Sequence, residues 1–146
     1  EAHAEHPGFD AWKPVLEQTS VLFVNEDGLE SLLPGLTMDQ AAERILPLGV
    51  QYMVVTCAEK GGAVFTKDQS IQYRAYRAAH VADTTGAGDC FNAAFLSEIV
   101  RGSDPKAAAR YAAAASTISI GAVGARTGLP AREQVLAFLA AEPEQI

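Results

Sequence analysis

Apolar residues along this chain form short continuous runs that alternate with spaced, helical patterns. The continuous runs at 21–24 and 51–57 are bounded by polar residues, which is typical of buried strands covered on both faces. Each run follows a helical pattern, the first over 11–18 and the second from Thr37 to about Gly49. The second pattern opens on Thr37-Met38-Asp39-Gln40, which has the spacing of a capping box. Helix and strand alternating in this way predict parallel βα units.

After residue 60 the pattern of apolar residues changes. Residues 63–66 and 70–74 alternate apolar and polar positions across Lys67-Asp68-Gln69, which predicts an antiparallel hairpin at the edge of the sheet. Residues 76–82 are expected to extend from the hairpin toward the next helix, and the short apolar stretch at 80–82 is expected to be a strand that passes into that helix.

Three helices are expected in the remainder of the chain. The first begins near Ala87 and ends at Gly102; the second starts around 103–105, where proline occupies a first-turn position. Alanines at 107–115 permit the close approach of a neighbouring element or of an adenine ring. A last amphipathic helix runs through 135–139. The expected fold is therefore an α/β three-layer α/β/α sandwich with a mostly parallel sheet and an antiparallel edge hairpin.

Composition narrows the class of protein. With 146 residues, 49% of them hydrophobic, the chain has room for one core and one domain. Its formal net charge of −7 argues against a nucleic-acid partner, because such surfaces neutralise phosphates with Lys and Arg. The longest uncharged run, 111–125, is shorter than the ~18 apolar residues of a membrane span. Residues 1–7 show no signal-peptide pattern, so we expect a cytoplasmic protein. Cys57 and Cys90 lack metal-ligand spacing and are expected to be buried free thiols.

The stretch Asp83-Thr84-Thr85-Gly86-Ala87-Gly88-Asp89 carries the candidate chemistry. The first turn of a helix has backbone amides without intrahelical partners and a partial positive charge, so it attracts anions. Gly86 and Gly88 let the backbone take unusual dihedral angles and let a phosphate come close to those amides. Asp89 could then take a proton from a hydroxyl that attacks the bound phosphorus. The alternative is a tight connection in which Asp89 only complements the helix dipole.

Residues 83–95 resemble the C-terminal signature of the ribokinase-like (PfkB) carbohydrate kinases. The resemblance implies that Asp89 is the catalytic base and contacts the substrate, and that Gly86, Ala87 and Gly88 form the anion hole. It extends from about Val21 to Leu139 but covers only the C-terminal half of the family pattern, without the half that selects the substrate and forms a lid.

The same resemblance implies a nucleotide site. The residues expected to bind ATP are Asn25, Thr56, Glu59, Gly61 and Gly88. Three positions after Asn25, where the family has a glutamate that organises magnesium, this chain has Gly28, and Glu26, Asp27 or Glu30 would have to substitute. In the loop, Cys57-Ala58 replaces the common Leu-Gly. The alternatives are that Asn25 is a helix N-cap and that Gly61 serves only a hairpin turn.

A monovalent-cation site is a further implication. The glycine-rich loop at 121–130 is expected to fold back beside the signature, as the equivalent loop does in the family, so that Asp83, Thr85, Ser119, Ala122 and Gly124 would be ligands for K⁺. The alternative is a connecting loop whose glycines only allow it to turn. Gly128 stands where some members carry a serine ligand.

These residues together predict ATP-dependent phosphoryl transfer to a hydroxyl of a sugar or related small alcohol, with ATP, Mg²⁺ and K⁺ as cofactors. A nucleoside acceptor, or a non-catalytic nucleotide-binding fragment, is the alternative. A homodimer is compatible with the full-length protein. Because the acceptor-binding half is absent, we expect the isolated chain to bind ATP weakly and to be inactive.

Overall fold

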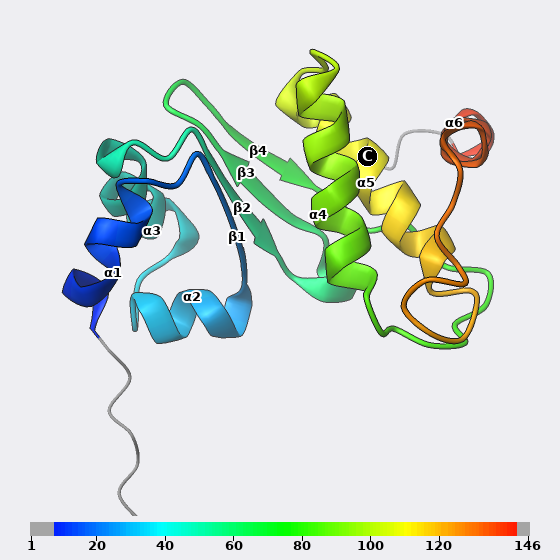
Figure 1. Ribbon diagram of the computed structural model, residues 1–146, viewed down its shortest axis with the longest axis horizontal. Coiled ribbons are helices and arrows are strands. Elements are labelled where there is room, and N and C mark those ends of the chain that lie inside the picture. Colours follow the sequence, from blue (N-terminus) through cyan, green and yellow to red (C-terminus); the bar gives the residue numbers. More distant parts are fainter. Residues whose placement is uncertain (1–7, 143–146) are drawn as a thin grey trace, which may run out of the picture. The chain divides into compact units, whose positions relative to one another are not determined.

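A computed structural model describes residues 8–142, and Figure 1 shows its helices and strands. The expectation about a signal peptide at residues 1–7 lies outside the described residues. The chain divides into two compact units, one of residues 1–57 and 63–70 and one of residues 58–62 and 71–146. Each unit is described by itself.

Four strands form one sheet in the order β1-β2-β3-β4. They are β1 (Val21–Asn25), β2 (Tyr52–Thr56), β3 (Gly62–Phe65) and β4 (Ser70–Tyr73). β1 and β2 are parallel, in a register that pairs Val21 with Tyr52 and Asn25 with Thr56. The turn between β3 and β4 is closed by the Thr66 amide, which donates to the Gln69 carbonyl at 2.9 Å. The parallel βα unit and the hairpin are therefore confirmed, and the sheet is mixed.

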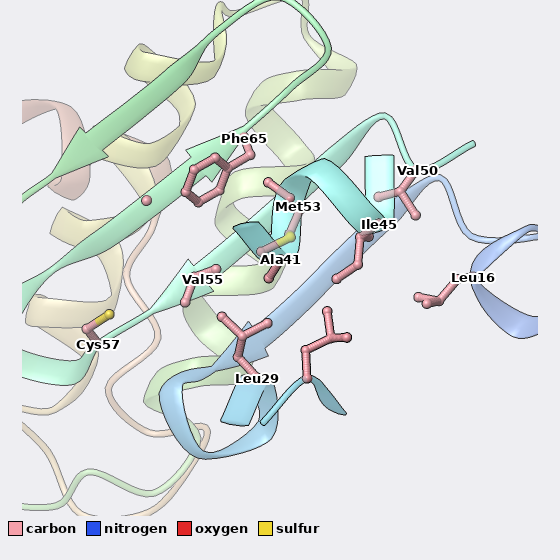
Figure 2. Packing of buried hydrophobic residues seen from close by; sticks show 12 residues of the cluster. Leu16, Leu29, Ala41, Ile45, Val50, Met53, Val55, Cys57 and Phe65 are labelled. Atoms are coloured by element: carbon pink, nitrogen blue, oxygen red, sulfur yellow. The ribbon is translucent and has the colours of Figure 1, made fainter. Parts of the chain in front are cut away.

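The first unit packs its helices around β2. These are α1 (Phe9–Leu16), α2 (Glu26–Leu32), α3 (Met38–Ile45) and the 3-10 turn η1 (Leu46–Leu48). Figure 2 shows Met53 and Val55 of β2 among Leu29, Ala41 and Ile45 of the helices. Met53, Val54 and Val55 are each 0% exposed, so β2 is covered on both faces, as its continuous apolar run predicts.

The predicted capping box opens α3. The Gln40 amide donates to Thr37 Oγ1 at 3.2 Å, and the Thr37 amide donates to Gln40 Oε1 at 3.0 Å. After η1, Gly49 takes a left-handed conformation with φ of 110°, which ends the helical segment. This local element is therefore specified by residues within one turn of each other.

The second unit consists of the 3-10 turn η2 (Ala58–Lys60) and the helices α4 (Ala87–Val100), α5 (Pro105–Ser119) and α6 (Arg132–Ala141). The Asp104 carboxylate caps α5 by accepting from the amides of Lys106 and Ala107, both at 3.0 Å. α4 and α5 lie side by side (Figure 1). Ala112 and Ala114 are 0% exposed, so close helix packing accounts for the buried alanines of α5. No helix within residues 8–142 is both long and apolar enough to cross a bilayer.

The prediction of a strand at 80–82 is wrong. No strand lies between Tyr73 and α4 in the described chain. The amides of Ala82 and Asp83 donate instead to the Ile120 carbonyl, at 2.8 and 3.3 Å, at the end of α5. Because those amides are bonded to α5, the chain reaches α4 through an irregular segment.

Candidate active site

The turn before α4 requires glycine at position 86. Gly86 is the N-cap of α4 and has φ of 78°, a left-handed conformation that residues with a Cβ rarely adopt. A Cβ on Gly86 would also lie 2.8 Å from the Cβ of Ala125, in the glycine-rich loop. The left-handed turn and the closeness of the loop therefore both exclude a side chain here.

This turn leaves backbone donors free at the start of α4. The Ala87 amide donates to the Thr84 carbonyl at 3.1 Å, and the Cys90 amide donates to the Gly86 carbonyl at 2.9 Å. Within the described chain the amides of Gly88 and Asp89 have no acceptor, and no side chain caps the helix. Of the predicted anion-hole residues, Ala87 has its amide engaged and Gly88 has it available. The 14 residues of α4 add the positive end of a helix dipole at this point.

Asp89 lies in the same first turn and is exposed. Its carboxylate makes no hydrogen bond or ion pair with a described residue. A carboxylate with free lone pairs, one residue beyond an open amide, is chemically able to accept a proton from a hydroxyl that lies beside an anion bound at that amide.

The Asp83 carboxylate ties the signature to the glycine-rich loop. Its Oδ1 accepts from the Thr85 amide at 2.9 Å and from Thr85 Oγ1 at 2.7 Å, and its Oδ2 accepts from the Gly124 amide at 2.8 Å. The hydrogen bond from the Thr85 hydroxyl, followed by those from the two amides, holds the pKa of Asp83 below its ordinary value. The loop therefore lies beside the signature, as the sequence predicts.

Three of the five predicted cation ligands are brought together by these bonds, namely Asp83, Thr85 and Gly124. Ser119 ends α5, where its hydroxyl donates to the Ser116 carbonyl at 2.8 Å. A Cβ on Gly128 would lie 2.1 Å from the Ser119 carbonyl oxygen, so this fold of the loop admits only glycine there. Ala122 is half-buried in the loop, without a contact that joins it to the others. The K⁺ site stays a prediction.

In the first unit, Asn25 and Thr56 are register partners at the carboxyl ends of β1 and β2. The Asn25 side chain accepts from the Gly28 amide at 2.7 Å and so caps α2, which is the alternative the sequence offered. A Cβ on Gly28 would lie 2.9 Å from Asn25 Oδ1, so a side chain at this position would displace the cap. Glu30 accepts from the Gly35 amide at 3.1 and 3.2 Å.

The loop after β2 carries Glu59 and Gly61, both in the second unit. Glu59 is exposed in η2, whereas Gly61 is buried with φ of 95°. A Cβ on Gly61 would lie 2.1 Å from the Tyr73 carbonyl oxygen, so the left-handed turn and the neighbouring backbone together explain this glycine. Ala58 has φ of 47° and is the single non-glycine residue with positive φ in the described chain. It stands where the family commonly has glycine.

One contact to the anion hole was missed by sequence reasoning. Ser116 of α5 donates its hydroxyl to the Ala87 carbonyl at 3.0 Å, across 29 residues of sequence. A serine inside an alanine-rich helix carries no local signal of its partner. Its one distinguishing feature is that it interrupts the apolar run in the part of α5 that packs against α4.

The model of the pfkB family of carbohydrate kinases matches residues 7–132, most of the chain. The chain belongs to this family. The ribokinase of Arabidopsis thaliana is 36% identical over 131 residues, which cover 86% of the chain and 35% of the ribokinase. The nucleoside kinase of Methanocaldococcus jannaschii is 35% identical over 124 residues, 84% of the chain and 39% of that kinase.

Solved structures of these two relatives share the fold. The A. thaliana ribokinase, complexed with ribose and ATP, superposes with a TM-score of 0.79 over 87% of the chain and 43% of the ribokinase. The M. jannaschii nucleoside kinase gives a TM-score of 0.81 at 31% identity, over 93% of the chain and 44% of that kinase. The chain thus spans less than half the length of these relatives and forms a partial ribokinase-like α/β domain.

Proposed function

We propose that this chain is the nucleotide-binding and catalytic-base half of an ATP-dependent kinase that phosphorylates a hydroxyl of a sugar. The observation that carries the proposal is the first turn of α4. There the free amides of Gly88 and Asp89 and the unpaired carboxylate of Asp89 occupy two adjacent residues. The complex of the A. thaliana relative with ribose and ATP supports the same substrates.

In the proposed reaction the Asp89 carboxylate accepts the proton of the acceptor hydroxyl as its oxygen attacks the γ-phosphorus. The new O–P bond forms as the bond from that phosphorus to the bridging oxygen breaks, and ADP leaves with that electron pair. The Gly88 and Asp89 amides donate to the equatorial oxygens, where negative charge must be stabilised during transfer. Asp83 holds the turn by binding the Thr85 and Gly124 amides.

Magnesium is proposed to enter with the triphosphate. The position of the family's metal-organising glutamate is Gly28 here, and Glu30 is occupied by the Gly35 amide. Glu26 and Asp27 are the exposed acidic residues of that turn. A relative of 26% identity from E. coli, a candidate ribokinase II with a TM-score of 0.83, was solved with ATP and Mg²⁺.

The acceptor hydroxyl belongs either to a sugar or to a nucleoside. A sugar is favoured by the A. thaliana ribokinase, and a nucleoside by the M. jannaschii kinase, at nearly equal identity. The residues that choose between them belong to the half that this chain lacks. Assaying the full-length protein with ribose and with inosine separates the two.

The decisive experiment is Asp89→Asn in the full-length protein. We expect kcat to fall by about 10²–10⁴-fold while the Kd for ATP changes little, because only the proton acceptor is lost. The matched control is Asp104→Asn, which makes the same charge change at the cap of α5, where asparagine caps equally well. Unchanged turnover in Asp89→Asn would remove Asp89 from its role. ATP binding without phosphorylation of any alcohol would favour a non-catalytic nucleotide-binding module.

A further inference from the structure

Ser116 makes the one side-chain hydrogen bond, within the described chain, that reaches the anion-hole turn from another helix. Its Oγ donates to the Ala87 carbonyl oxygen at 3.0 Å, and both residues are half-buried. In an α-helix that carbonyl already accepts from the amide four residues later, so Ser116 takes its second lone pair.

The Ala87 carbonyl and the Gly88 amide belong to the same peptide group. A trans peptide is planar, with its C=O and N–H pointing in opposite directions, so fixing the oxygen fixes the direction of the N–H. The Gly88 amide is one of the two that have no acceptor in the described chain. Ser116 therefore acts on the orientation of a donor that the proposed reaction needs.

A hydrogen bond to the carbonyl also strengthens the donor at the other end. Hydrogen bonds in a chain polarise one another, and electron density drawn toward the Ala87 oxygen makes the Gly88 N–H a better donor. Gly88 has no side chain to hinder a phosphate, so its polarised N–H can donate directly to a bound anion.

The need for such a contact follows from the glycines. Gly86 takes the left-handed conformation, and Gly88 follows in the first turn of α4, where a residue without a side chain restrains the backbone least. Ser116 lies on α5, whose neighbouring residues Ala114 and Ala115 are buried at 0% and 3% exposure. The hydroxyl is thus held by a rigid helix while it restrains a soft turn.

We infer that Ser116 is a positioning residue of the phosphoryl-transfer reaction, whose hydroxyl orients and polarises the Ala87–Gly88 peptide so that the Gly88 amide stabilises the transferred phosphoryl group. This inference rests on the proposed function. Ser116 itself does not touch the reacting atoms.

The test compares Ser116→Ala with Ser116→Thr in the full-length protein. Deleting an anion-hole donor costs about 10²–10³ in kcat; here the donor remains but is less well held, so we expect Ser116→Ala to lower kcat about tenfold. The KM for ATP should change less than about twofold, because the effect is confined to the transition state. Ser116→Thr keeps the hydroxyl and should restore kcat to within about threefold of wild type.

The matched control is Ser97→Ala in α4. Ser97 also donates to a helix carbonyl, that of Ala94 at 2.8 Å, but it is exposed and lies away from the first turn. Its kcat should stay within about twofold of wild type, since losing an exposed hydrogen bond costs little.

A binding measurement separates positioning from a merely structural role. The probe is ADP with aluminium fluoride, which mimics the phosphoryl group in transfer. We expect Ser116→Ala to weaken its binding about tenfold while ADP alone binds as in wild type, since transition-state mimics report interactions made only there. If Ser116→Ala does not fold, Ser116→Cys, which keeps the volume but is a weak donor, takes its place.

An unchanged kcat in folded Ser116→Ala overturns the inference, and so does an equal loss of affinity for ADP with and without aluminium fluoride. A Ser116→Thr variant as slow as Ser116→Ala overturns it as well. These failures leave Asp89→Asn informative, so the proposed function survives them. If instead the wild-type protein transfers no phosphoryl group, or Asp89→Asn keeps full turnover, the proposed function fails and this inference with it.

Discussion

Ala58 adopts a backbone conformation that its own side chain disfavours. It is exposed and sits at φ of 47°, a left-handed conformation in which the Cβ crowds the following carbonyl. At Gly61, three residues later, the same kind of conformation is occupied by a residue without a Cβ. The backbone is therefore strained at Ala58 and unstrained at Gly61.

Replacing Ala58 with glycine should stabilise the protein. The left-handed conformation costs an L-residue about 1–2 kcal/mol, part of which is offset by the greater freedom of glycine in the unfolded chain, so we expect a gain of about 0.5–1 kcal/mol. Urea unfolding measures it. The control is Ala137→Gly at an exposed site inside α6, which should destabilise by about 1 kcal/mol. Equal destabilisation by Ala58→Gly and Ala137→Gly would show that the backbone at Ala58 is not strained.

Among the elements, α4 and α6 are joined by a buried carboxylate. Glu98 of α4 is 6% exposed, and its Oε1 accepts from Arg132 Nη1 of α6. Ser103 Oγ donates to Glu98 Oε2 at 2.9 Å, and the Arg132 guanidinium stacks over the Tyr111 ring at 5.2 Å. The hydrogen bond from Arg132 is the main cause that holds the pKa of Glu98 below its ordinary value, against the opposing effect of burial.

Glu98→Gln should destabilise the protein by about 1–2 kcal/mol, because it removes the buried carboxylate that pairs with Arg132, while the arginine itself is partly exposed and stays solvated. Chemical unfolding compares it with Asp10→Asn, which breaks the exposed pair of Asp10 and Lys13 and should cost less than about 1 kcal/mol. A cost of Glu98→Gln no larger than that of the surface control would show that the pair is not stabilising.

The same carboxylate gives a pH dependence with a definite sign. Because the folded pKa of Glu98 lies below the ordinary value of 4.5, its contribution is complete above 4.5 and is lost as the pH falls through the folded pKa. The melting temperature of the wild type should therefore drop more steeply than that of Glu98→Gln between about pH 5 and pH 2. Equal losses of melting temperature in the wild type and in Glu98→Gln over this pH range would contradict the contribution of Glu98.

At the scale of the whole molecule, the chain covers 35% and 39% of the lengths of the two relatives compared by sequence. Phosphoryl transfer depends on positioning both reactants and on excluding water. In the proposed function this chain holds the base and the amides, and residues outside it fix the acceptor.

We expect residues 1–146 alone to phosphorylate ribose at least about 10³-fold more slowly than the full-length protein, because the effective concentration of the positioned acceptor is lost. ATP should bind weakly. A coupled assay for ADP release, with Asp89→Asn as the background, and calorimetric titration with ATP measure the two quantities. Rapid, acceptor-dependent ADP release by this chain alone would show that the positioning surface is already present.

Much of the fold could be predicted from the sequence because the signals were local. The caps at Thr37 and Asp104 each act within one helical turn. The apolar runs that predicted β1 and β2 each lie within one strand. The signature at 83–89 likewise predicted a left-handed glycine turn with open amides. The prediction of a strand at 80–82 failed because the amides of Ala82 and Asp83 donate to the carbonyl of Ile120, which no local pattern reveals.

By itself the sequence determined the elements, the family and the residues of the candidate base and anion hole. Only the tertiary structure decided which amides stay free and that Gly61 and Gly128 are required by close backbone neighbours. It also joined Ser116 to Ala87 and Asp83 to Gly124, across 29 and 41 residues. The reason is physical: propensity and capping act over a few residues, whereas a buried hydroxyl or carboxylate takes whichever donor or acceptor the packing brings to it.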